Sequence, residues 1–188
     1  MATAKRAAKA GTASKAAATG SRVGTGNSPA ADRTPGKRAS LRRMLTRRDD
    51  NYEIDTTAGR LDLDLVTGWL STDAYWAKGR PADVIARSVE HSINFGVYDP
   101  AGAQVGFARV ITDNATFAWL CDVYIARDAR GLGLGTWLAQ TTAEHVRDLG
   151  VRRMVLATLD AHTVYEKAGF VPLANPNRWM EIDVRGTL

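Results

Sequence analysis

Three glycines alternate with leucine in segment 130–135, which reads Arg-Gly-Leu-Gly-Leu-Gly and opens a helical pattern. Glycines leave backbone N–H groups unobstructed by side chains, and a helix N-terminus adds a partial positive charge. The segment is therefore suited to bind phosphate or another anion. It is neither a P-loop nor the dinucleotide fingerprint G-x-G-x-x-G, because Gly135 is followed by Thr136 and Trp137.

Several polar side chains could take part in proton transfer. Asp122 stands in an otherwise apolar stretch and is either a general base, an ammonium anchor or a structural carboxylate held by hydrogen bonds. Tyr165 offers a phenol that can donate a proton. Asp160 and His162 stand at the start of the segment that carries Tyr165, where Asp160 is equally suited to cap a helix.

Two further features could belong to a site. Tyr75 and Trp76 lie between two predicted helices and form either an acceptor pocket, by cation–π contact with an amine, or an aromatic cluster that caps a helix. Cys121 stands next to Asp122 and could form an acyl-cysteine. A lone cysteine in a strand is more often a small buried side chain, and alternation turns it away from Asp122.

The periodicity of apolar residues predicts the elements that position these groups. The expected helices cover 63–70, 82–91, 134–149 and 161–167, and the expected strands cover 52–55, 93–98, 104–112, 116–126, 152–158, 170–173 and 179–184. Strand 116–126 is mostly apolar on both faces and should be central, with Leu120, Asp122 and Tyr124 on one face and Cys121 on the other. The order predicts one mixed α/β domain.

Two motifs resemble those of the GCN5-related N-acetyltransferase (GNAT) family. The first is Arg130-x-x-Gly133-x-Gly135, where the family has Arg or Gln, then Gly, then Gly or Ala. The second is Tyr165-x-x-x-Gly169-Phe170, which lies 30 residues after Gly135. The resemblance covers about residues 52–184 and is greatest to small bacterial members of unassigned substrate. It implies a mixed, mostly antiparallel central sheet flanked by helices.

The resemblance also implies a reaction. Acetyl-CoA would be the co-substrate, without a metal, and an acceptor amine would attack it directly in a ternary complex. Tyr165 would protonate the departing thiolate, Asp122 would be the second catalytic candidate, and Tyr75, Trp76, Asp160 and His162 would border the acceptor. The residues implied to bind the donor are Val123, Tyr124, Ile125, Arg130, Gly131, Leu132, Gly133, Leu134, Gly135 and Thr136. A non-catalytic acyl-CoA-binding module is the alternative.

Charge divides the chain into a tail and a domain. Residues 1–48 carry 12 Lys and Arg against one acid, whereas residues 49–188 carry 13 against 19. The tail has no aromatic residue, and we expect it to be disordered, with a short helix near 40–48 and the domain over 51–188. Such a tail is either a solubilising extension, a transit peptide, or a basic arm that could tether a protein acetyltransferase to nucleic acid.

Composition narrows the setting of the protein. One cysteine and three scattered histidines, His162 among them, predict neither an internal disulfide nor a metal site. No apolar run is long enough for a membrane span, and no secretory signal is present, so we expect a cytoplasmic protein without a membrane partner. The expected strand 179–184 could pair across a homodimer.

Overall fold

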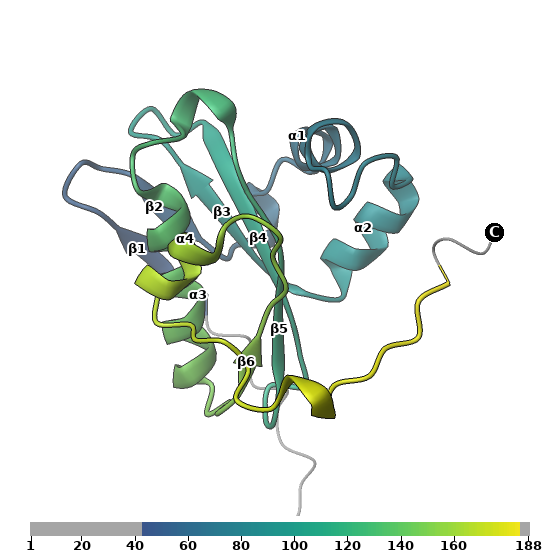
Figure 1. Cartoon of the computed structure of the whole chain (residues 1–188). Helices are drawn as coiled ribbons and strands as arrows, with labels where there is room; N and C mark the ends of the chain where they lie inside the picture. Colours follow the sequence, from purple (N-terminus) through teal and green to yellow (C-terminus); the bar gives the residue numbers. More distant parts are fainter. Residues whose placement is uncertain (1–42, 185–188) are drawn as a thin grey trace, which may run out of the picture. The chain divides into compact units, whose positions relative to one another are not determined.

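A computed structural model describes residues 43–184 of the chain. They form a six-stranded sheet in which the strands lie in sequence order (Figure 1). The strands are β1 (Leu45–Arg47), β2 (Glu53–Asp55), β3 (Ile93–Tyr98), β4 (Gln104–Thr112), β5 (Ala118–Ile125) and β6 (Met154–Val155). The helices are α1 (Leu63–Gly68), α2 (Ala82–Glu90), α3 (Leu134–Asp148) and α4 (His162–Lys167), with a π-helical turn over Trp69–Asp73.

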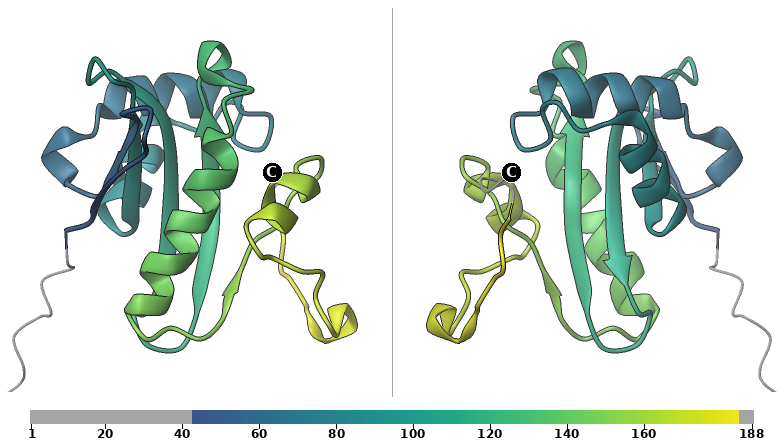
Figure 2. Two further views of the ribbon diagram at one scale, coloured as in Figure 1. Left: turned by 90° about the vertical axis from the view of Figure 1, so that its left-hand side faces the viewer. Right: turned by 90° about the vertical axis from the view of Figure 1, so that its right-hand side faces the viewer.

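The sheet opens between its last two strands. All neighbouring strands are antiparallel except β5 and β6, which run parallel. The predicted mixed, mostly antiparallel sheet is therefore confirmed. Ala118 pairs with Met154 and Trp119 with Val155, after which the chain that follows β6 diverges from β5 (Figure 2). Within the described sheet, the part of β5 after Trp119 has no neighbouring strand on the side where β6 pairs.

Helices cover both faces of the sheet (Figure 1). Leu138 of α3 joins Phe95 in the larger apolar core, and Ile85 of α2 joins Phe107 in the smaller one. Because Phe107 and its neighbour in β4, Ala108, belong to different cores, the two cores lie on opposite faces. Each fully buried side chain of the size of leucine or phenylalanine contributes about 1.5–3 kcal/mol.

A β-bulge interrupts the regular alternation of β5. Phe107 pairs with Tyr124 and Arg109 with Cys121, so β5 has one more residue than β4 between these pairs. Asp122 lies within the bulge with φ of 51°, in the left-handed region that few non-glycine residues occupy. The bulge bends the strand beside the edge that β6 leaves open.

The bulge also changes which residues share a face. Tyr124 packs in the smaller core with Phe107, whereas Leu120 lies in the larger core, against which Val123 also packs. The prediction that Leu120 and Tyr124 lie on one face is therefore wrong. Strict alternation holds only for a strand without an inserted residue, and the sequence pattern did not reveal the insertion.

The N-terminal part of the described chain also differs from the prediction. Residues 45–47 form edge strand β1, which pairs with β2, and not a helix. Met44 N–H donates to Thr56 Oγ1 at 2.9 Å, and Thr56 N–H donates to Met44 O at 3.0 Å. The sheet thus includes residues before 51, where the domain was expected to begin. Residues 1–42 of the predicted disordered tail lie outside the described residues.

The strands expected over 170–173 and 179–184 do not form in the described chain. This region contains a 3₁₀ turn over Pro176–Arg178, while Val171, Met180 and Ile182 are 82%, 96% and 95% exposed. An alternating pattern yields a strand only where a neighbouring strand supplies hydrogen bonds. The described sheet has no strand beyond β6 to do so, and β6 itself is shorter than the predicted strand 152–158.

Candidate active site

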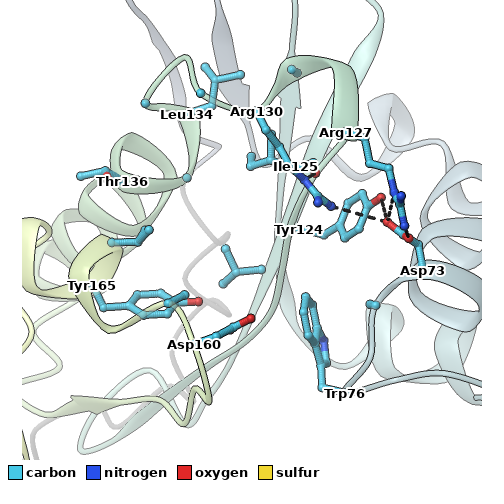
Figure 3. Close-up of a pocket in the computed structure, with 18 of the residues that line it drawn as sticks. Asp73, Trp76, Tyr124, Ile125, Arg127, Arg130, Leu134, Thr136, Asp160 and Tyr165 are labelled. Carbon is cyan, nitrogen blue, oxygen red and sulfur yellow. Dashed lines mark hydrogen bonds and ion pairs between the residues drawn. The ribbon is translucent and has the colours of Figure 1, made fainter.

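A cavity of about 520 Å³ lies where β5 and the segment after β6 diverge (Figure 3). We call it the donor cavity. Four stretches that are distant in sequence form its walls: residues 73–76, the end of β5, residues 127–136 and residues 160–165. The open edge of β5 thus becomes one side of a cavity whose other walls come from the helical segments.

The glycine segment presents backbone donors to this cavity. Gly131 and Gly133 have φ of 82° and 74°, which favours glycine at both positions. Gly133 is also the N-cap of α3, and no side chain caps the helix. The first backbone bond of the helix runs from Trp137 N–H to Gly133 O at 3.1 Å, so the N–H groups of residues 134–136 lack partners within α3. Free donors and the helix dipole together suit an anion such as phosphate.

Arg48, directly after β1, supports this glycine turn from outside the cavity. Its Nη1 donates to Leu132 O at 3.0 Å, and its guanidinium lies 5.5 Å from the ring centres of both Tyr52 and Trp137. Asp50 fixes the other side of the guanidinium by accepting from Nε at 2.8 Å. The contact links the first strand of the sheet to the loop that precedes α3.

Asp73 organises the cavity wall next to the end of β5. Its carboxylate accepts from Tyr124 Oη at 2.6 Å and forms ion pairs with Arg127 and Arg130 (Figure 3). The hydrogen bonds from Arg127 and then Tyr124 hold the pKa of Asp73 well below its usual range. Arg130 also donates from Nε to Ile125 O at 2.9 Å. Two guanidiniums facing one carboxylate give this rim a net positive charge, which attracts an anionic ligand.

Tyr165 projects from α4 into the donor cavity (Figure 3). Burial, with smaller effects of Tyr75 and Asp160, raises the pKa of Tyr165 to about 12. The phenol therefore stays protonated at neutral pH and can donate a hydrogen bond. Asp160 accepts from Tyr75 Oη at 3.2 Å, which places a carboxylate on the same cavity.

A second cavity of about 550 Å³ shares Trp76, Asp160 and Tyr165 with the donor cavity. We call it the acceptor cavity to distinguish it from the donor cavity, because none of residues 127–136 lines it. Its lining also includes Asp122, Arg80 and Arg109. The two cavities therefore meet at Tyr165 and Asp160.

Asp122 is a buried carboxylate surrounded by donors. Oδ2 accepts from Arg80 Nη1 at 2.8 Å and Arg109 Nε at 2.5 Å, and Oδ1 accepts from Trp76 Nε1 at 3.2 Å. Burial raises the pKa of Asp122, but the hydrogen bond from Arg80 and the charge of Arg109 outweigh this effect and lower the pKa overall. A carboxylate so stabilised is a poor proton acceptor. Of the roles left open, the geometry favours a structural carboxylate that positions the two arginines.

Comparisons with known proteins agree with this arrangement. The model of the acetyltransferase (GNAT) family matches residues 63–170, more than half of the chain. The chain belongs to the GNAT family. The match contains both predicted motifs, so the resemblance inferred from them is confirmed. Members of the family transfer acetyl groups and use acetyl-CoA.

Individual relatives support the assignment. A crystal structure of a GNAT-family protein from Xanthomonas campestris pv. campestris, assigned as an acetyltransferase, is 40% identical with a TM-score of 0.67, covering 72% of this chain and 95% of that one. A Gibberella zeae protein assigned to the acetyltransferases is 33% identical over 62% of this chain and 77% of its own length. The N-acetyltransferase ycf52 of Porphyra purpurea is 33% identical over 51% of this chain and 58% of its own length.

The GNAT domain brings most predicted site residues together. Nine of the ten residues expected to bind the donor line the donor cavity, and Leu132 does not. Tyr75, Trp76 and Asp160 line both cavities, as Tyr165 does. His162 lines neither of them and borders a separate cavity next to β6.

Cys121 lines the acceptor cavity beside Asp122, although alternation predicted that the two would point apart. The bulge accounts for this difference, because regular alternation ends there. Burial raises the pKa of Cys121 to about 12, so its thiol stays protonated. Since the thiolate is the nucleophile in acyl-cysteine chemistry, this environment disfavours such a mechanism.

Three arginines near the two cavities are not among the predicted site residues. Arg48 belongs to the predicted tail, and no signal in the sequence connects it with Leu132, 84 residues away. Arg80 and Arg109 were not associated with Asp122. A usable signal existed for Arg109, because a cation within one apolar strand and an anion within the next predict a cross-strand ion pair.

Residues 43–184 contain neither a candidate membrane span nor a candidate metal site. None of their helices is long and apolar enough to cross a membrane. In the same residues, no cluster of three or more His, Cys, Asp or Glu side chains is arranged to hold a metal ion.

Proposed function

We propose that this domain transfers the acetyl group of acetyl-CoA to an amine by direct attack within a ternary complex. The observation that carries the proposal is the junction of the two cavities at Tyr165, since donor and acceptor must meet at one point for direct transfer. Acetyl-CoA would supply the thioester, and the residues of the chain would bind, orient and exchange protons with the two reactants.

The donor cavity would hold acetyl-CoA. Backbone N–H groups of Gly131, Gly133 and residues 134–136 would bind the pyrophosphate, with Arg127 and Arg130 adding positive charge at the rim. The open edge of β5 at residues 123–125 would bind the pantetheine arm through main-chain hydrogen bonds, as an added strand does. Glycine at these turns keeps side chains away from the phosphates.

Tyr165 would donate a hydrogen bond to the sulfur that leaves. A phenol whose pKa is about 12 loses its proton less readily than a thiol, whose usual pKa is about 8.5. Hydrogen bonding to the developing thiolate is therefore a better description of its role than complete proton transfer. The acceptor arrives as an ammonium and must lose a proton before attack. Asp160 would hold it and accept the proton, directly or through water.

Thermal unfolding with acetyl-CoA tests the donor site, with ADP and NAD as controls. A specific ligand at 100 times its dissociation constant stabilises the folded state by about 2.7 kcal/mol. We expect an increase in Tm with acetyl-CoA that ADP and NAD do not match. Amine-dependent release of free thiol then tests transfer. A Tm increase without thiol release from any amine would support the non-catalytic binding module instead.

A further inference from the structure

The acceptor cavity contains more positive charge next to Asp122 than this carboxylate neutralises. Arg80 and Arg109 both pair with its Oδ2, at 2.8 and 2.5 Å. The side chain of Asp122 is 2% exposed, and those of Arg80 and Arg109 are 24% and 11% exposed. Two guanidiniums and one carboxylate leave one positive charge in a partly buried place, which an additional anion would stabilise.

Arg80 is the arginine that remains accessible. Hydrogen bonds within the described chain use Nε and Nη1 of Arg109, the second of which reaches Ser92 Oγ at 3.2 Å. Arg80, in contrast, donates to the described chain only from Nη1, so its Nε and Nη2 keep their donor capacity. A guanidinium with two free donors in one plane matches the two oxygens of a carboxylate or a phosphate.

The position of Arg80 is fixed by the backbone that precedes α2. Arg80 N–H donates to Ala77 O at 2.9 Å, and Gly79 N–H donates to Ser71 O at 2.8 Å. Gly79 has φ of 78°, which allows the chain to turn back toward Asp122. Trp76, from the same turn, donates to the other oxygen of Asp122. The guanidinium is therefore held in place before a ligand arrives.

The opposite charge lies where the two cavities meet. Asp160 lines both of them, accepts from Tyr75 Oη, and is close enough to Tyr165 to affect its pKa. Figure 3 shows Asp160 between Tyr165 and Trp76. An ammonium beside this carboxylate would be next to the point where the acetyl group is transferred. The acceptor cavity thus has an anionic group near the reaction and a cationic group beside Asp122.

We propose that the acceptor is an amine that also carries an anionic group, with its ammonium at Asp160 and its anion at Arg80. This inference rests on the proposed acetyl transfer at Tyr165 and names the substrate class of that site. Asp122 and Arg109 position Arg80, and Arg80 binds the acceptor. An amine without an anionic group would leave the extra positive charge without a counterion, so binding energy would be lost.

Matched acceptor pairs test the charge requirement, with the full-length chain and acetyl-CoA. The probes are the standard L-amino acids with their amides, and phosphoethanolamine with ethanolamine. We expect kcat/KM from thiol release to be at least about 10-fold higher for the acid-bearing member of one pair, as a charge-assisted bidentate contact provides. The pair that responds distinguishes a carboxylate from a phosphate. The inference would be overturned if the members without an acid had an equal or greater kcat/KM, or if no probe led to thiol release.

Variants of Arg80 test its role. Arg80→Met should raise KM for the acid-bearing acceptor about 10-fold or more, while KM for the partner without the acid does not rise and acetyl-CoA still increases Tm. Arg80→Lys should keep part of the preference for the acid-bearing acceptor that Arg80→Met loses. Arg87→Met is the matched control, because Arg87 lies on α2 with a side chain that is 64% exposed. If KM rose equally for both members of the pair while Tm was maintained, the role of Arg80 would be merely structural, and the proposal would be contradicted.

The two proposals fail in different ways. If acetyl-CoA does not raise Tm, the proposed function fails. If acetyl-CoA raises Tm and amines release thiol without a preference for acid-bearing acceptors, only the inference about the acceptor fails.

Discussion

Arg48 donates a hydrogen bond from Nη1 to the backbone carbonyl of Leu132, 84 residues later in the chain. The bond joins the end of β1 to the centre of the glycine segment. Its acceptor is a backbone group between two glycines of positive φ, Gly131 and Gly133. Arg48 therefore contributes to the shape of the donor cavity without lining it.

Replacing Arg48 should weaken donor binding. Arg48→Met removes a charge-assisted hydrogen bond of about 1.5–3 kcal/mol to a loop that must be ordered for binding. We expect the Kd for acetyl-CoA to rise about 10-fold, as measured by calorimetry. Arg47→Met is the control, since Arg47 pairs with Glu53 and its side chain is 62% exposed. The same change in both variants would mean that general surface charge, and not the Leu132 contact, determines affinity.

Two glycines of the loop should respond oppositely to alanine. Gly133→Ala places a side chain at φ of 74° and should lower the free energy of unfolding by about 1–2 kcal/mol. At Gly135, in the first turn of α3, a Cβ would meet Val164 Cγ1 at 3.7 Å, an ordinary contact. Gly135→Ala should therefore be neutral or stabilise the protein by up to about 1 kcal/mol through helix propensity. Urea denaturation compares the two, and a larger loss for Gly135→Ala would contradict this account.

Tyr165→Phe separates catalysis from packing. Loss of the phenolic hydroxyl should lower kcat about 100-fold, in the range of a single hydrogen-bond donor to a developing anion, and leave the Kd for acetyl-CoA nearly unchanged. Because the pKa of Tyr165 is raised to about 12, the wild-type kcat should not decline from its ionisation below about pH 10. Tyr52→Phe, outside both cavities, is the control. An unchanged kcat in Tyr165→Phe would leave Tyr165 only a packing role against Phe170.

Asp122 should matter more for stability than an exposed aspartate does. Asp122→Asn removes the charge that Arg80 and Arg109 share and should lower the free energy of unfolding by about 3 kcal/mol. Asp83→Asn, whose side chain is 73% exposed, should change it by less than about 0.5 kcal/mol. Chemical denaturation of the two variants provides the comparison. Equal stability, with only Asp122→Asn inactive, would instead favour Asp122 as the general base.

His145 should make stability depend on pH. It is 7% exposed on α3, and its Nε2 has no hydrogen-bond partner among the described residues. Burial lowers the pKa of His145, so the unfolded chain binds a proton more readily than the folded one. The free energy of unfolding should therefore fall as pH decreases below about 6.5, the pKa of an unperturbed histidine, until the folded-state pKa is reached.

Variants isolate this titration from the protonation of carboxylates. His145→Gln should have a flatter profile of unfolding free energy between pH 7 and about pH 5 than the wild type has. His91→Gln changes an exposed histidine after α2 and should keep the wild-type slope. If His91→Gln flattens the profile and His145→Gln does not, the assignment to His145 is wrong.

Local patterns determined much of this protein. Apolar periodicity predicted α1, α2, α3 and the hairpin of β3 and β4, because these elements depend on contacts between residues close in sequence. The glycine segment and the Tyr165 block predicted the GNAT family, which the family match confirmed, because the turn before α3 needs glycine wherever it occurs.

Only the tertiary structure decided which face of the sheet Asp122 lies on and that Arg80 joins it. The extra residue in β5 is invisible in its composition, yet it places Asp122 within reach of Arg80 and Arg109. Arg48 likewise reaches Leu132 only because β1 joins the sheet. Likewise, the C-terminal alternation over 179–184 could not yield a strand without a neighbour. In each case the outcome depends on which distant segments lie side by side, and the local patterns of a single sequence do not reveal those contacts.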